Sequence, residues 1–197
     1  HRSLGATKYM ILNSTVAQDT ASVVWNDTEP TSSVFSLGTN GTVNDSGQTF
    51  VAYLFAHDAG GFGLTGTDNV ISCGSYTGNG STTGPTVTLG YEPQYLMVKN
   101  ASAADYWVIV DNMRGMPVAS SISRYLIANL SGAEGGFENF FTPTATGFQL
   151  KSNDTMVNAN GNTYIYIAIR RGPMKVPTDA TKVFSPITAN AAAGTAQ

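Results

Sequence analysis

The sequence predicts an all-β protein made of tandem antiparallel β-sandwich units of a jelly-roll or lectin-like type, with the first unit incomplete. Three observations support this prediction. Apolar and polar residues alternate over short stretches, turn-forming dipeptides separate these stretches, and one half of the chain repeats the other. Alternation with a period of two is typical of strands that bury one face. The pattern therefore favours packed antiparallel sheets over helices.

Seven short stretches rich in aromatic and β-branched residues are the expected strands. Asn40-Gly41, Asn79-Gly80 and Asn160-Gly161 are dipeptides that favour tight hairpin turns. No stretch of a dozen residues has a helical apolar stripe, and 120–134 fits a helical turn or a strand entry equally well. The expected strands are 50–56, 86–91, 94–100, 106–112, 125–130, 147–152 and 163–169.

The repeat is clearest in two similar stretches. VNDSGQTFVAYLFA begins at Val43 and VNANGNTYIYIAIR begins at Val157. Two further pairs follow the same order at an offset of about 115 residues: KYMILNSTVAQ with RYLIANLSGAE, and PTSSVFSLGTN with PTATGFQLKSN. Three matched pairs in one order indicate a duplicated unit.

The repeat also predicts which residues are equivalent. Tyr9 and Tyr125 should occupy matching inward positions, as should Phe35 and Phe148. Within 50–56 the side chains alternate, so one set should face the core. The two alternating sets are Phe50, Ala52 and Leu54, and Val51, Tyr53 and Phe55.

The two units are not equally complete. Residues 1–72 form the first unit, and 73–172 form a second, complete unit that carries three or four additional strands in 74–115. HRSLG at the start corresponds to DNMRG (111–115), so the first unit lacks its N-terminal strands. We expect that His1 is not the native start or that a neighbour donates the missing strands. The stretch 173–197 resembles a linker-like tail.

Composition excludes several functions. Charged residues make up 12% of the chain, about half of the usual ~25%. The net charge of −3 without a basic run argues against nucleic acid binding. No apolar stretch approaches the ~20 residues of a membrane helix, so no membrane insertion is expected. The single Cys73 excludes an internal disulfide framework and fits a small buried residue.

No catalytic constellation is visible, so we expect no enzyme and no cofactor. Asp58 and Asp68 flank a glycine-rich loop and are weak metal candidates, although the glycines more simply permit a tight turn. His57 should make hydrogen bonds that organise this loop. Weak candidates for stacking against sugars are Tyr76, Tyr91, Tyr95 and Trp107, which fit a sandwich core equally well.

Several motifs together resemble a repeated β-domain of tail-fibre-like structural proteins of tailed bacteriophages, of the marine and cyanophage type. The residues that carry the resemblance span nearly all of 1–175. They are FVAYLFAHDAGGFG, NVISCGSYTGNG, LGYEPQYLMVKNAS, WVIVDNMRG, ATGFQL and TYIYIAIRRGPM. The family as we know it has no established catalytic residues, so none are transferred.

The resemblance implies a structural virion component, such as a tail fibre, spike or capsid-surface protein, that contributes to attachment to the host surface. It implies a location in the virion, assembly with other copies of the chain and other virion proteins, and a homo-oligomer, with a trimer expected for a fibre. One alternative is a lectin-like module that binds host glycans. A polysaccharide depolymerase is a further alternative, for which the clustered acids are Asp105, Asp111, Glu134 and Glu138.

Overall fold

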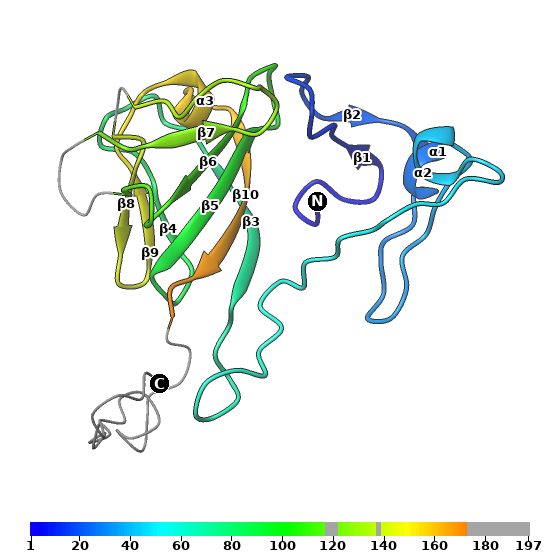
Figure 1. The fold of residues 1–197 in the computed structure, drawn as a ribbon, viewed down its shortest axis with the longest axis horizontal. Coiled ribbons are helices and arrows are strands. Elements are labelled where there is room, and N and C mark those ends of the chain that lie inside the picture. Colours follow the sequence, from blue (N-terminus) through cyan, green and yellow to red (C-terminus); the bar gives the residue numbers. More distant parts are fainter. Residues whose placement is uncertain (117–121, 137–138, 173–197) are drawn as a thin grey trace, which may run out of the picture.

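The structure of the chain, a computed structural model, describes residues 1–116, 122–136 and 139–172. It is an all-β fold in which a five-stranded sheet packs against a three-stranded sheet (Figure 1). The elements are β1 (Lys8–Tyr9), β2 (Asp19–Thr20), α1 (Ser22–Trp25), α2 (Gly41–Asn44), β3 (Ile71–Thr77), β4 (Thr86–Thr88), β5 (Pro93–Asn100), β6 (Trp107–Asp111), β7 (Tyr125–Ile127), β8 (Phe141–Thr144), β9 (Gly147–Leu150), α3 (Thr155–Asn158) and β10 (Thr163–Arg170).

Both sheets of the sandwich are antiparallel and come from the second half of the chain. The five-stranded sheet has the order β3-β10-β5-β6-β7, and the three-stranded sheet has the order β4-β9-β8. β10 lies between β3 and β5, and Tyr166 is paired with Gly74 on one side and Val98 on the other. The strand that ends the repeat is therefore an interior strand with partners on both edges.

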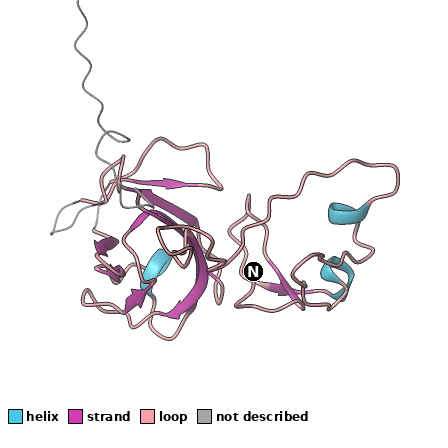
Figure 2. Ribbon diagram, turned by 90° about the horizontal axis from the view of Figure 1, so that it is seen from below, coloured by secondary structure: helices cyan, strands magenta, loops and turns pink. Residues whose placement is uncertain are grey.

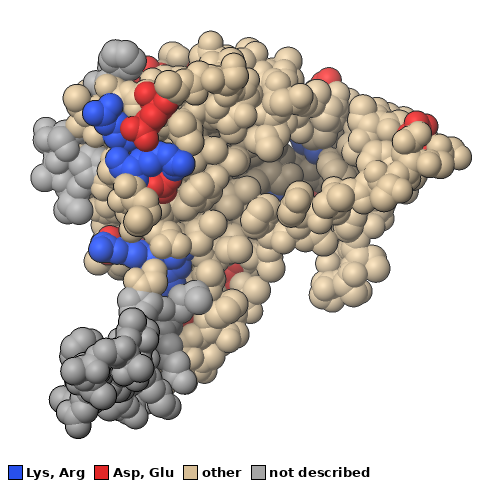
Figure 3. All heavy atoms as spheres, viewed as in Figure 1, with Lys and Arg blue, Asp and Glu red and all other residues tan. Residues whose placement is uncertain are grey.

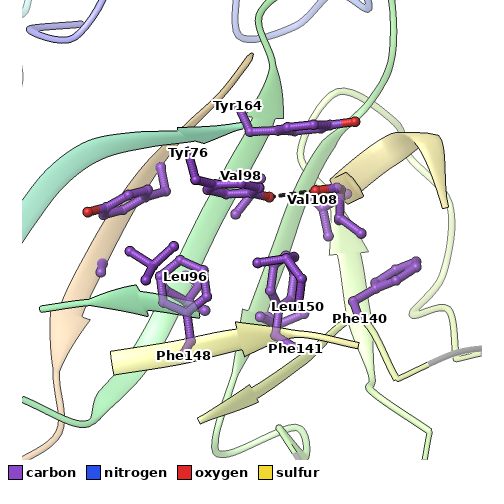
Figure 4. Packing of buried hydrophobic residues seen from close by; sticks show 14 of the residues in the cluster. Tyr76, Leu96, Val98, Val108, Phe140, Phe141, Phe148, Leu150 and Tyr164 are labelled. Carbon is purple, nitrogen blue, oxygen red and sulfur yellow. Dashed lines mark hydrogen bonds between the residues drawn. The ribbon is translucent and has the colours of Figure 1, made fainter. Parts of the chain in front are cut away.

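The core between the sheets is rich in aromatic residues (Figure 4). The Phe148 ring is fully buried and meets the rings of Tyr76, Phe141 and Tyr166 edge to face, at centroid distances of 6.2, 5.8 and 5.5 Å. Tyr76 also stacks on Tyr164 at 5.1 Å. Edge-to-face and offset pairs are the preferred aromatic geometries and add to the apolar burial that holds the two sheets together.

The N-terminal half forms a separate part of the molecule with little regular structure (Figure 2). It contains the two-residue ladder β1–β2, the four-residue helices α1 and α2, and long loops. Its first residues contact the five-stranded sheet, where Leu4 and Met10 pack against the small cluster of Ala101, Trp107 and Ile165. Further links are hydrogen bonds from the Gln18 and Asp105 backbone N–H groups to the carbonyls of Ala101 and Thr15.

Six of the seven predicted strands contain an observed strand, and the all-β fold is confirmed. The predicted strand at 50–56 is wrong, because these residues form no regular structure and are all exposed. Four strands were missed: the two-residue strands β1 and β2, β3, whose small residues obscure the alternation, and β8, which contains Pro143. Asn40-Gly41 starts helix α2 and does not form a hairpin turn.

The predicted equivalence of side-chain burial holds only in part. Tyr9 and Tyr125 are both half-buried. Phe148 is fully buried, whereas Phe35 is 37% exposed, so the expectation of matching inward positions is wrong for the phenylalanines. None of Phe50, Ala52 and Leu54 faces a core, because no sheet formed by the described residues covers this segment.

Candidate assembly site

The main surface anomaly of the molecule is the apolar segment 50–56, which we call the bare segment. Val51, Tyr53 and Leu54 are 78, 83 and 74% exposed. Its backbone makes no hydrogen bond to another described residue. Burying one large apolar side chain contributes about 1.5–3 kcal/mol. A run of exposed apolar residues is therefore typical of a surface that another polypeptide covers.

The turn before the bare segment is the same as the turn before β10. Asn40 caps α2 by accepting a hydrogen bond from the Thr42 N–H group, as Asp154 caps α3 by accepting one from Met156. In each turn an asparagine side chain then bonds back to a carbonyl six residues earlier. These bonds run from Asn44 Nδ2 to the Gly38 oxygen at 2.8 Å and from Asn158 Nδ2 to the Ser152 oxygen at 2.9 Å.

A glycine with positive φ follows each turn, at Gly47 (77°) and Gly161 (78°). This conformation is readily adopted only by glycine and directs the chain into the next segment. The bare segment and β10 therefore begin from the same local geometry. A sequence match at this point is accompanied by a match in backbone conformation.

Two further pairs of contacts match at earlier positions of the repeat. Tyr9 pairs with Asp19 in the β1–β2 ladder, and Tyr125 pairs with Gly135 in an antiparallel bridge with the same separation along the chain. The Gly38 N–H group donates to the Val24 carbonyl, and the Lys151 N–H group donates to the Phe140 carbonyl. The two halves thus share local contacts along most of the repeat.

The halves differ in what surrounds their last segment. β10 is paired along its length with β3 and β5, and β6 and β7 extend the sheet. The N-terminal half has no strands in the places of β3, β5 and β6 among the described residues. A second difference is that Phe50 takes the position of Tyr164 in the repeat and has no hydroxyl group. The Tyr164 hydroxyl donates to the Thr155 oxygen and accepts from the Ala159 N–H group.

The four candidates for sugar stacking do not gather in one exposed place. Tyr76 and Tyr91 are 8 and 3% exposed and belong to the core between the sheets. Trp107 is 9% exposed on the opposite face, where its indole N–H group donates to the Ile11 carbonyl. Tyr95 is half-buried, and burial raises the pKa of its hydroxyl. Buried rings offer no face to a sugar in this conformation.

The two metal candidates are engaged with other side chains. Asp58 accepts a hydrogen bond of 2.5 Å from the Ser72 hydroxyl and lies 3.3 Å from His57 Nε2. Asp68 pairs with Arg170 at 3.3 Å. In the part of the chain that the structure describes, no group of three His, Cys, Asp or Glu residues is arranged to hold a metal ion.

His57 joins the end of the bare segment to β3. Its Nδ1 atom accepts a hydrogen bond from the Cys73 N–H group at 3.1 Å, and the Asp58 N–H group donates to the Ile71 carbonyl at 2.9 Å. The Cys73 side chain is buried, as predicted, and burial raises the pKa of its thiol. A thiol with a raised pKa is a poor nucleophile.

Two of the four acids considered for glycan hydrolysis are joined by an arginine. Arg114 pairs with Asp111 and lies 3.6 Å from Glu134, and Arg124 lies 4.0 Å from the same Glu134. Figure 3 shows charged side chains gathered on the sandwich, whereas the N-terminal half is mostly uncharged on this face. Asp105 accepts a hydrogen bond from the Tyr106 N–H group, and Glu138 lies outside the described residues.

The fold and this surface define a β-sandwich protein whose N-terminal half has an apolar segment with no sheet partner in the described part of the chain. Among the described residues, no helix has the length and apolar character needed to cross a membrane. The chain belongs to the family DUF7483, described as a domain of unknown function, which it matches over residues 1–173. No curated protein and no solved structure matches the chain.

Proposed function

We propose that this chain is a structural assembly module of a bacteriophage virion, in a tail fibre, spike or capsid-surface protein, with a mechanical and adhesive role and no catalysis. The observation that supports the assembly role is the bare segment, where Val51, Tyr53 and Leu54 are at least 74% exposed. A protein that acts alone in solution rarely keeps such a strand-like apolar run uncovered.

The remaining surface favours a structural role over a chemical one. The clustered carboxylates of Asp111 and Glu134 share Arg114 as an ion-pair partner. The two carboxyl groups of a glycosidase flank the scissile bond with the sugar between them, whereas Arg114 lies between Asp111 and Glu134 and pairs with both. We propose the virion as the place of assembly because the repeat motifs resemble structural domains of phage proteins.

Peptide mapping by mass spectrometry of purified phage particles tests this proposal. Particles are prepared from a culture that produces the protein, and the soluble lysate is the control. We expect peptides of this chain in the particles at many copies each, together with surface labelling by an antibody against the sandwich. Presence in the lysate and absence from the particles would contradict the proposal.

A further inference from the structure

We propose that the bare segment is an acceptor strand that takes two antiparallel strands from another module of the same family, one on each edge. This inference rests on the assembly role proposed above and specifies the partner of that surface. It identifies the segment that binds, the side chains that turn inward and the shape of the partner.

The pairing of β10 predicts the pairing of the bare segment, since both follow the same capped turn. β10 is paired with β3 on one edge and with β5 on the other. Transferred through the repeat, Phe50, Ala52 and Leu54 take the places of Tyr164, Tyr166 and Ala168, which face the core. Val51 and Tyr53 then take the places of Ile165 and Ile167 on the outer face.

The partner is therefore a pair of extended segments that resemble β3 and β5. An edge-to-edge pair of two bare segments from two copies would satisfy only one edge of each. Main-chain bonds supply the affinity of such strand addition, and alternate side chains supply its specificity. The partner needs apolar side chains where it faces Phe50 and Leu54. Its pairing residues need no charge, because the bare segment has no charged residue.

One position indicates that the partner differs from a copy of this chain. In the second half, Tyr166 lies over Gly74, and a Cβ atom added at Gly74 would lie 2.4 Å from the Tyr166 hydroxyl oxygen. The first half has Ala52 where the second has Tyr166. The space left by the missing ring suits a larger side chain on the donated strand. The best donor thus carries a residue such as valine where β3 carries Gly74.

A fusion protein tests the acceptor directly. Residues 71–111, a segment with the required strands, are joined in front of His1 of the full chain by a short Gly-Ser linker. Hydrogen exchange followed by mass spectrometry should show the amides of the bare segment exchanging at least about tenfold more slowly than in the parent chain. Replacing Gly74 by Val in the donated copy alone should slow this exchange further.

Two variants and one control define the result. In the fusion, Leu54→Asp should abolish the added protection, while Tyr53→Asp should retain it because Tyr53 is assigned to the outer face. A fusion that carries 71–111 in scrambled order should give no protection. The amides of β10, read in the same sample, report whether the second half is folded.

Three outcomes would overturn the proposal. The first is unchanged exchange in the bare segment with both donor versions. The second is equal sensitivity of the protection to Leu54→Asp and Tyr53→Asp. The third is protection of the parent chain that rises with its own concentration, which would identify a second copy as the occupant. Absence of the protein from phage particles would refute the virion role and leave the strand pairing intact, so the two failures are distinguishable.

Discussion

The two halves of this chain share local contacts and differ in their burial. Both halves contain the capped turn with its asparagine bond, at Asn44 and Asn158. Among the described residues, 21 of the 23 buried hydrophobic residues lie after residue 70, and 14 of the 18 exposed large hydrophobic residues lie before it. The comparison shows that a turn depends on its own few residues, whereas a strand depends on its neighbours.

Truncating matched phenylalanines should give the largest difference between the halves. Phe148 is fully buried, so Phe148→Ala should lower the free energy of unfolding by about 3–5 kcal/mol. Phe35 is 37% exposed, and Phe35→Ala should cost less than about 1 kcal/mol because little packing is lost. Urea unfolding followed by tryptophan fluorescence measures both. Equal losses would mean that the first half has a core of its own.

Removing the matched asparagines should also lower stability more in the second half than in the first, with a smaller difference than for the phenylalanines. Asn158 is fully buried, and its Nδ2 group donates to Asn79, Ser81 and Ser152. Asn158→Ala leaves buried groups unpaired and should cost about 2–3 kcal/mol. Asn44→Ala loses one bond at an exposed residue and should cost about 1 kcal/mol or less. Thermal unfolding of the two variants tests this, and a reversed order would contradict the comparison.

The helix caps provide a finer test. Asp154→Ala should lower global stability by about 1 kcal/mol, because α3 is packed on the sandwich core. Asn40→Ala removes the equivalent cap of α2, which buries no residue. We expect this variant to loosen only its own turn, seen as faster local hydrogen exchange with an unchanged unfolding midpoint. A shifted midpoint in Asn40→Ala would show that the two halves unfold together.

The last expected effect is a pH dependence at the contact between the halves, where titration changes one group and deletes no side chain. Lys99 Nζ donates to the carbonyls of Thr15, Asn100 and Ala103, and its side chain is buried. Burial lowers its pKa from 10.5 to about 8, opposed by the nearby Asp105 carboxylate. Between these values the unfolded chain binds more protons than the folded one, so the free energy of unfolding should rise with pH.

Urea unfolding between pH 8 and pH 10 measures this slope, with Lys99→Met as the variant that removes it. The range stops at pH 10 because burial raises the pKa of Tyr164 and of Tyr166 to about 12. Their contribution to stability is lost as pH rises above the ordinary tyrosine value of 10. The same slope in the Lys99→Met variant would show that another group is responsible.

The sequence was sufficient to predict the fold class and most strands of the second half, because alternation and aromatic content persist in 94–100 and 163–169. It failed at 50–56, whose alternation is as clear as that of β10. Periodicity reports which faces a strand would bury and contains no information about whether its partners are present. The signal of this difference was the unequal length of the two matched stretches of sequence, since among the described residues only the second half contains the strands β3 to β6.

The candidate site was harder to predict than the fold. Aromatic residues chosen for sugar stacking, such as Tyr76 and Tyr91, belong to the core, because a sandwich this small fills its interior with rings. Arg114 forms an ion pair with Asp111, three residues earlier in the chain. The second arginine near Glu134, Arg124, was not expected because the two come together only when Tyr125 pairs with Gly135.

Hydrogen exchange of the unmodified chain is the most direct test of whether the bare segment lacks sheet partners. The amides of 50–56 should exchange at nearly the rate of an unstructured peptide, while those of Thr163–Arg170 should be strongly protected by pairing on both edges. Similar protection in the two segments at low protein concentration would contradict the account, since it would place the first half in a completed sheet of its own.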